Sequence, residues 1–313
     1  MDIRRISAHG YTALINLSRG ANCVSLTHEQ SSANILREPC YDRELDNPFL
    51  YGMPILFPQN RISGGEFEFE GRRYRFPINE EKTGCHLHGI LHSLPFTLDK
   101  ISDNSISVYY CAKSGEYLGF PHDFRISMSY TLTDDGLVHK TVVENLSDTA
   151  MPCFLGFHTT FNASPFGNAP TRVLVDVKKE YERNMECYLP TGVCPPPDDV
   201  TRALTDGSFD PYSKPISRHY RSGGDMRIEI RSDKYTVVYE NSKNMPFRLI
   251  YNGDASGYIC LEPQTNLADA PNAPFDRAET GFFAIAAHSG ECFESKIKVI
   301  NTKGVRTNEN HKA

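Results

Sequence analysis

The sequence predicts an all-β protein that folds as a large antiparallel β-sandwich with few short helices. The main observation is a period-two alternation of apolar and polar side chains in many short segments, which is typical of strands with one buried face. A second observation is that turn-forming residues separate these segments, while no stretch of helical periodicity exceeds about three turns. Many short strands joined by turns favour a sandwich or a barrel.

The clearest predicted strand covers residues 124–132, where every second side chain is apolar. Other segments carry the same alternation or a shorter β-prone run: 106–111, 226–231, 236–239, 247–251, 258–261 and 296–300. Turn signals separate several of these strands, at 134–136, 252–254 and 289–291.

The Pro-rich, polar region 189–220 is predicted as long loops that either cover a site or connect strands. We assign residues 1–300 to a single β-sandwich domain and residues 301–313 to a C-terminal tail.

The composition narrows the classes of function. Lysine plus arginine number 33 and aspartate plus glutamate 39, a formal net charge of -6, which argues against a nucleic-acid partner. Neither a membrane-spanning run of about 18 apolar residues nor a signal-peptide core is evident. The nine cysteines form no Cys-x-x-Cys pair, as expected for free thiols in a reducing compartment. We expect a cytoplasmic protein without a membrane partner, as a monomer or a homodimer.

One candidate site lies in the segment Asn60-Arg61-Ile62, which follows Pro58 and precedes the pair Gly64-Gly65. The guanidinium of Arg61 offers planar, paired donors that suit vicinal oxygens of a small oxygen-rich molecule. The alternative is that Arg61 pairs with a carboxylate and holds a loop, since arginine ion pairs are common. The motif alone leaves both interpretations open.

A second candidate is the pair His86 and His88, two residues apart, so that both would share one face of a strand. They could bind a metal together with Glu80 and Glu81, take part in hydrogen bonding or proton transfer, or be structural. No further spacing supports a metal site, so that interpretation ranks below the other two.

His158 and Glu262 complete the set of candidates. His158 lies in an aromatic, β-prone run, where a lone histidine is more often a core residue. Glu262 ends an apolar strand, and apolar neighbours would raise its pKa and make it a better base near neutrality. The alternative for Glu262 is a strand-end glutamate that faces water. Gln264 adds a polar group just beyond it.

Taken together, these segments resemble the aldose 1-epimerases, also called galactose mutarotases. Each matching fragment is weak alone, but their order and spacing are specific. They cover most of the chain, at 20–21, 51–54, 60–62, 71–79, 87–89, 130–132, 145–148, 156–158, 161–162, 189–192, 261–265 and 269–272.

The resemblance implies a β-sandwich that holds the sugar in an open cleft and needs neither a cofactor nor a metal. It implies that Glu262 is the catalytic base, that His158 is the catalytic acid, and that Arg61 and His88 hold the hydroxyls and ring oxygen of the sugar. The implied partner is a small-molecule aldose. We add two neighbouring polar residues as candidate substrate-binding groups, Asn60 and Gln264.

The implied activity is the interconversion of α and β anomers of a free sugar. A base takes the proton of the C1 hydroxyl while an acid protonates the ring oxygen, and each positioned group contributes about 10²–10⁴-fold. We expect the two groups on opposite sides of C1 and the ring oxygen, facing each other across a space as wide as one pyranose. The alternative is a sugar-binding or sensing protein that lacks turnover.

One segment departs from the family pattern. The family carries a sugar-binding aspartate after the Pro-rich loops, and here Ser217 stands at the expected place with Arg218 beside it. We therefore treat Ser217 and Arg218 as candidate substrate-binding residues. The added positive charge makes an anionic or otherwise modified sugar conceivable, with Arg218 or His219 as its contact. The alternative is misalignment in a variable loop.

Overall fold

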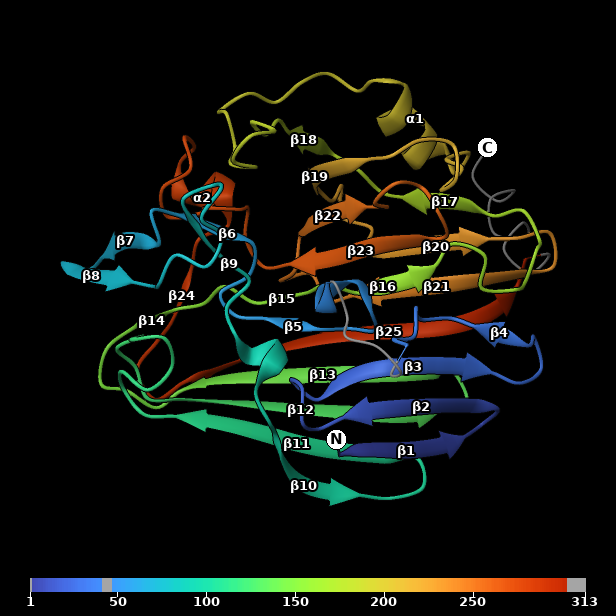
Figure 1. Ribbon diagram of the computed structural model, residues 1–313, viewed down its shortest axis with the longest axis horizontal. Coiled ribbons are helices and arrows are strands. Elements are labelled where there is room, and N and C mark those ends of the chain that lie inside the picture. The colour runs from blue at the N-terminus through green and yellow to red at the C-terminus, as the bar shows by residue number, and fades with distance from the viewer. Residues whose placement is uncertain (1, 41–46, 303–313) are drawn as a thin grey trace.

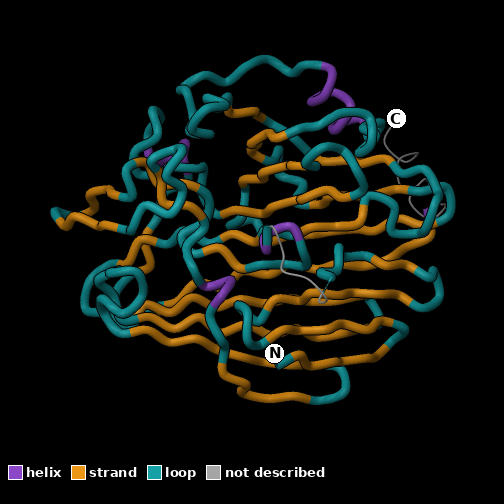
Figure 2. Tube along the Cα trace, in the orientation of Figure 1, coloured by secondary structure: helices purple, strands orange, loops and turns teal. Residues whose placement is uncertain are grey.

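The computed structural model describes residues 2–40 and 47–302. Figures 1 and 2 show stacked sheets of strands with only a few short helical segments. Neighbouring strands within these sheets run antiparallel, as in the ladder from β11 (Ser105–Ala112) through β12 (Phe124–Thr133) to β13 (Gly136–Asn145). The predicted antiparallel β-sandwich is therefore confirmed.

The largest sheet has eight strands in the order β10-β11-β12-β13-β25-β21-β20-β17. Its remaining strands are β10 (Thr97–Ile101), β17 (Arg172–Val175), β20 (Arg227–Arg231), β21 (Tyr235–Asn241) and β25 (Gly290–Asn301). The long C-terminal strand β25 lies between β13 and β21, so it joins two halves of the sheet that are far apart in sequence.

The second layer contains a seven-stranded sheet in the order β18-β19-β22-β23-β15-β5, with β16 also paired to β23. Its strands are β5 (Ile55–Leu56), β15 (Gly156–Phe157), β16 (Thr160–Asn162), β18 (Lys179–Tyr181), β19 (Ser217–Arg221), β22 (Phe247–Tyr251) and β23 (Tyr258–Gln264). A four-stranded N-terminal sheet extends this layer and consists of β1 (Ile3–Ala8), β2 (Tyr11–Asn16), β3 (Asn22–His28) and β4 (Ala33–Asn34).

The two layers share one large hydrophobic core, because alternate side chains of each strand point inward. Every second residue of β12 is buried, as its sequence pattern predicts. Tyr239 of the large sheet packs on Phe161 of β16 with ring centroids 5.3 Å apart. The hydroxyl of Tyr130 donates across the layers to the carbonyl of Ala21 at 2.9 Å. These contacts fix the second layer, which carries the candidate site.

Short elements complete the structure. Two-stranded ribbons are formed by β6 (Arg61–Ser63) with β9 (Cys85–Leu87), β7 (Glu66–Phe69) with β8 (Arg72–Arg75), and β14 (Met151–Pro152) with β24 (Ala284–Ile285). The helical segments are η1 (Pro48–Leu50), η2 (Leu91–Ser93), α1 (Asp199–Asp206) and α2 (Arg277–Thr280). No helix within 2–40 and 47–302 is long and apolar enough to cross a membrane.

The prediction of loops alone for residues 189–220 was wrong, because this region contains α1 and most of β19. The carboxylate of Asp198 accepts the amide of Thr201 and caps α1, and Gly207 ends it in the left-handed conformation. A helix of eight residues is too short for periodicity to reveal it. Most of the predicted tail, 301–313, lies outside the described residues, and Asn301 is the last residue of β25.

Candidate active site

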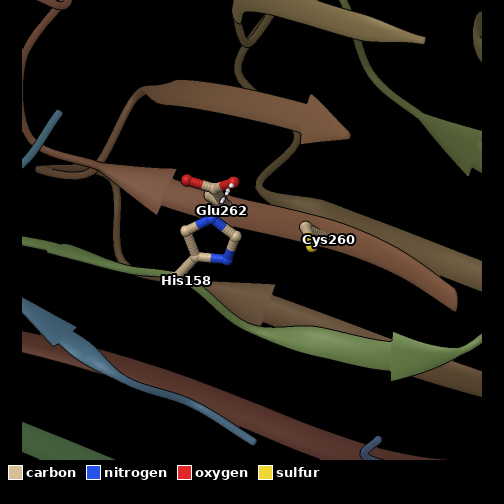
Figure 3. Close-up of side chains that lie close together, drawn as sticks. All are labelled: His158, Cys260 and Glu262. Carbon is tan, nitrogen blue, oxygen red and sulfur yellow. Dashed lines mark ion pairs between the residues drawn. The ribbon is translucent and has the colours of Figure 1, made fainter. Parts of the chain in front are cut away.

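Glu262 and His158 lie side by side in the second layer. Glu262 belongs to β23, and His158 lies between β15 and β16, which both pair with β23. The two side chains point toward each other (Figure 3), with His158 Nε2 3.2 Å from Glu262 Oε1. The side chain of Glu262 is fully buried and that of His158 is 8% exposed. The strand pairing therefore brings together residues that are a hundred positions apart.

The expectation that the two groups face each other across a pyranose was wrong. A separation of 3.2 Å leaves no room for a sugar ring between the imidazole and the carboxylate. The C1 hydroxyl oxygen and the ring oxygen are bonded to the same carbon, so one acid and one base need only reach the same edge of the sugar. The observed arrangement fits an approach of both groups to that edge.

Burial shifts the two ionisation equilibria in opposite directions. Loss of solvent raises the pKa of Glu262 to about 8, partly offset by the charge of Arg183 and by the hydrogen bond from Gln264. Loss of solvent also lowers the pKa of His158 to about 3. Desolvation disfavours the charged form of each group. Near neutral pH the pair therefore holds one proton, which rests on the carboxyl group.

Two amide side chains orient the carboxyl group. Gln264 Nε2 donates to Glu262 Oε2 at 3.2 Å, and Asn60 Nδ2 donates to Gln264 Oε1 at 3.3 Å. All three side chains are buried. The structure thus brings the predicted residues Asn60 and Gln264 into a chain of hydrogen bonds that ends on Glu262, so both act on the carboxyl group.

His88 lies beside His158, with ring centroids 5.6 Å apart at an angle of 84°. Burial, together with the nearby His158, holds the pKa of His88 well below its usual range, so its imidazole is neutral. The ring of Phe49 in η1 packs on His88 at 4.7 Å, on His92 at 4.4 Å and on His158 at 5.8 Å. Phe49 therefore shields three imidazoles from water at once.

Arg61 forms a two-pronged ion pair with Glu80, from Nε and from one terminal nitrogen, each at 2.6 Å. The alternative in which Arg61 holds a loop through a carboxylate is thus observed. The carbonyl of Arg61 accepts the amide of Asp269 at 2.8 Å. The ring of Tyr188 lies 4.5 Å from the guanidinium carbon. Both contacts fix Arg61 at the same end of the second layer as Asn60.

Several residues near the candidate site have left-handed backbone conformations that non-glycine residues rarely adopt. Asn60, His88, Asp269 and Tyr188 have φ angles of 55°, 62°, 55° and 59°. Each such residue costs about 1–3 kcal/mol and persists only where the surrounding structure holds it. Such strain is typical of functional sites, and here it sets the directions of the amide, imidazole and phenol groups.

Ser217 and Arg218 separate onto opposite faces of the sheet. Ser217 pairs through Tyr251 with Cys260, and His219 pairs through Leu249 with Glu262, so Ser217 and His219 share the face of Glu262.

Arg218 points to the other face. There it forms ion pairs with Glu180 at 2.9 Å and with Asp198 at 2.7 Å. The structure does not bring Arg218 to the candidate site, because a shift of one residue along a strand reverses the direction of the side chain. The prediction of Arg218 as a substrate contact was therefore wrong.

The arginine that does reach the candidate site is Arg183, which lies two residues after β18. It is 7% exposed and donates from one terminal nitrogen to the carbonyl of Ser217 at 2.7 Å and to its hydroxyl at 2.8 Å. Sequence reasoning missed Arg183 because no motif surrounds it. The pairing of β18 with β19 could have revealed it. Tyr181 lies opposite His219, so two residues further along position 183 lies opposite Ser217.

The metal site proposed from His86, His88 and the carboxylates at 80–81 is not formed. His86 Nδ1 lies 2.7 Å from the carbonyl of Pro77, and His88 leaves the strand with its positive φ. Among the described residues, one group has ligand atoms within 4.8 Å of one another, namely His158, Cys260 and Glu262 (Figure 3). Burial raises the pKa of the Cys260 thiol well above its usual range, which opposes formation of a metal-binding thiolate.

Comparisons with known proteins agree with this geometry. A family model described as aldose 1-epimerase matches residues 3–299. The chain therefore belongs to the aldose 1-epimerase family, whose members are isomerases that act on small sugars.

Relatives and solved structures support the same assignment. The chain is 26% identical over 255 residues to the uncharacterized protein YphB of Escherichia coli K12, covering 79% of this chain and 82% of that protein. It is 25% identical over 261 residues to galactose mutarotase of Rattus norvegicus, covering 79% and 70%. A galactose mutarotase-like protein from Clostridium acetobutylicum superposes with a TM-score of 0.88 at 29% identity over 95% of each chain.

Proposed function

We propose that this protein is a mutarotase, which interconverts the α and β anomers of a free aldose by opening and reclosing the ring. The observation that carries the proposal is the buried pair of Glu262 and His158, 3.2 Å apart, with oppositely shifted pKa values. A pair that shares one proton always offers one donor and one acceptor. Ring opening of a hemiacetal needs one of each.

The proposed reaction begins when the proton of the pair moves from Glu262 to His158, which are 3.2 Å apart. The Glu262 carboxylate then takes the proton of the C1 hydroxyl while the imidazolium of His158 gives its proton to the ring oxygen. The C1–O5 bond breaks, and the open aldehyde turns about the C1–C2 bond. The pair then holds its proton on Glu262, which is the form favoured by burial. On reclosure His158 takes the proton of the C5 hydroxyl and Glu262 returns one to the C1 oxygen, so the pair ends as it began.

The other proposed residues bind and orient the sugar. Glu80 holds Arg61 through Nε and one terminal nitrogen. The remaining N–H groups of the guanidinium can donate as a pair to neighbouring hydroxyl oxygens of the sugar. His88, as a neutral imidazole, offers one donor and one acceptor to a hydroxyl or the ring oxygen. Gln264 and Asn60 act through Glu262, whose carboxyl group they orient. Their role is positioning, and it supplies the preorganisation that proton transfer requires.

The experiment measures the rate of anomer exchange for several aldoses by NMR exchange spectroscopy. The wild type is compared with Glu262→Gln and His158→Gln. We expect each variant to lower kcat/KM by about 10²–10⁴-fold, with an unchanged circular-dichroism spectrum as evidence of folding. Glu29→Gln, at an exposed position, is the control and should match the wild type. An undiminished rate in Glu262→Gln would reject the assignment. Saturable binding without acceleration by the wild type would instead support a sugar-binding or sensing protein.

A further inference from the structure

Arg183 is a buried cation that has no acidic partner within ion-pair distance among residues 2–40 and 47–302. It is 7% exposed, and its hydrogen bonds to described residues go to the carbonyl and hydroxyl of Ser217, both uncharged. No carboxylate of the described chain lies within ion-pair distance of it, whereas the nearby Arg61 is paired with Glu80. An uncompensated buried charge costs several kcal/mol, so its retention calls for an explanation.

The other arginines of the second layer differ from Arg183 either in their ion pairs or in their exposure. Arg218 pairs with Glu180 and Asp198 on the opposite face. Arg248 also forms no ion pair with a described carboxylate, but it has no exposed surface at all, so a ligand cannot reach it. Arg183 keeps some exposure and lies on the face of the sheet that carries Glu262. It is therefore the buried arginine that a substrate bound at the catalytic pair can reach.

Glu262, which lies on the same face of the sheet, does not balance the charge of Arg183 near neutral pH. Burial raises the pKa of Glu262 to about 8, so its carboxyl group is mainly neutral near pH 7. The ring of Tyr188 lies 4.5 Å from the guanidinium carbon of Arg61 and 5.8 Å from that of Arg183, which places two cations on one aromatic group. Although burial and Arg61 lower the pKa of Arg183 to about 10, it stays protonated at neutral pH.

We propose that the substrate is an aldose that carries an anionic substituent, and that the free donors of Arg183 bind this anion. A guanidinium binds carboxylate, sulfonate and phosphate oxygens through paired, charge-assisted hydrogen bonds. Ser217 supports this assignment. Its hydroxyl orients Arg183 and leaves the positive charge in place, whereas an aspartate at this position would neutralise that charge. The inference rests on the proposed function, since it names the substrate class of the same site.

The first experiment compares neutral aldoses with their anionic counterparts. Anomer exchange is measured by NMR for D-glucose and D-galactose, their uronates, their 6-phosphates and 6-deoxy-6-sulfo-D-glucose. We expect kcat/KM for at least one anionic sugar to exceed that of its neutral parent by about 10- to 100-fold, as for a charged hydrogen bond. The arms distinguish carboxylate, phosphate and sulfonate. Equal or faster exchange of every neutral parent would overturn the inference while leaving the proposed function intact.

The second experiment tests the residues. Arg183→Gln and Ser217→Asp should each reduce the ratio of anionic to neutral kcat/KM by about 10-fold or more, because one removes the cation and the other neutralises it. In Ser217→Asn the new side chain has nearly the same shape as aspartate but no charge. This variant should therefore retain the preference for anionic over neutral sugars. Arg125→Gln, on the large sheet and distant in the fold, controls for net charge. An unchanged ratio in folded Ser217→Asp would overturn the inference.

Calorimetric titration separates the two proposals if no sugar is turned over. Binding of an anionic aldose that is tight in the wild type and at least 10-fold weaker in Ser217→Asp than in Ser217→Asn would support anion recognition without mutarotation. Binding of neutral and anionic sugars with equal affinity, or of neither, would overturn it.

Discussion

Gln264 Nε2 lies 3.2 Å from Glu262 Oε2, and the two side chains, two residues apart in β23, are both fully buried on the same face. The amide donates to the carboxyl oxygen that does not approach His158. It stabilises the ionised form of Glu262 and so partly offsets the effect of burial on the pKa. The strand itself thus places Glu262 beside a group that shifts its pKa.

Replacement of Gln264 by methionine, which has a similar volume but no amide, should therefore raise the pKa of Glu262 further and reduce kcat by about 10-fold. The measurement is the pH profile of kcat for Gln264→Met beside the wild type. Gln30→Met, at an exposed position, is the control. A merely structural role for Gln264 would lower the melting temperature but leave the position of the pH profile unchanged, which would contradict the prediction.

The shared proton of Glu262 and His158 predicts an alkaline limit to activity. Below a pKa of about 8 the pair holds one proton, and above it the pair holds none, so no group remains to protonate the ring oxygen. We expect kcat/KM to be level near neutrality and to fall as the pH rises through about 8. The measurement is anomer exchange from pH 5 to 10 after subtraction of the spontaneous rate. If kcat/KM instead rises as the pH passes through 8, ionised Glu262 acts together with an acid other than His158, and the prediction is wrong.

The same burial predicts that Glu262 destabilises the folded protein at high pH. Its pKa is about 8 when folded and near the model-peptide value of 4.5 when unfolded, so the folded state binds the proton more tightly. Its stabilising effect is complete below the unfolded pKa and is lost as the pH rises through the folded pKa.

Glu262→Gln should therefore gain stability relative to the wild type by about 3–4 kcal/mol between pH 5 and pH 8, since one pKa unit corresponds to about 1.4 kcal/mol. Urea unfolding at both pH values measures this change. Glu29→Gln should show no such trend because Glu29 is exposed. A stability difference that is independent of pH would mean that Glu262 is ionised at neutrality in the folded protein.

Strands with one buried face could be predicted from sequence, because burial imposes a period of two. The predicted strand 124–132 lies within β12, in which every second residue is buried. The predicted strand 247–251 coincides with β22, whose first four residues are all buried, so a β-prone run rather than alternation indicated it. The helix α1 could not be seen, because eight residues with a polar N-cap look like loop. The assignments of oligomeric state and cellular compartment stay predictions.

The candidate site was partly predictable, since the resemblance pointed to Glu262 and His158, which the structure brings to 3.2 Å. Their placement side by side could not be predicted, because it depends on how β15 and β16 pair with β23. Arg218 was chosen by its position beside Ser217, yet the pleat turns it away. Arg183, not Arg218, lies beside Ser217 on the face of Glu262, because of a cross-strand register that no local motif encodes.

Phe49 gives the last prediction, because its ring contacts the imidazoles of His88, His92 and His158 with centroid distances of 4.7, 4.4 and 5.8 Å. The chain has no tryptophan, so a hydrophobic platform for a sugar must come from phenylalanine or tyrosine. Phe49 also keeps water from His158, whose pKa burial lowers to about 3. Loss of the ring should therefore affect both sugar binding and the acid limb of the pH profile.

We expect Phe49→Ala to raise KM by about 10-fold, which corresponds to about 1.4 kcal/mol, and to move the acid limb of kcat/KM toward neutrality as water reaches His158. Phe49→Leu retains most of the apolar volume, so it should raise KM while leaving the acid limb nearly in place. Phe166→Ala, whose ring packs on Tyr235 of the large sheet, is the control for loss of an aromatic group. Kinetics from about pH 2.5 to 8 distinguish the two effects, since the pKa of His158 is about 3 in the wild type. If the acid limb of Phe49→Ala coincides with that of the wild type, shielding by Phe49 does not set the pKa of His158, and the strand environment of β15 and β16 must do so.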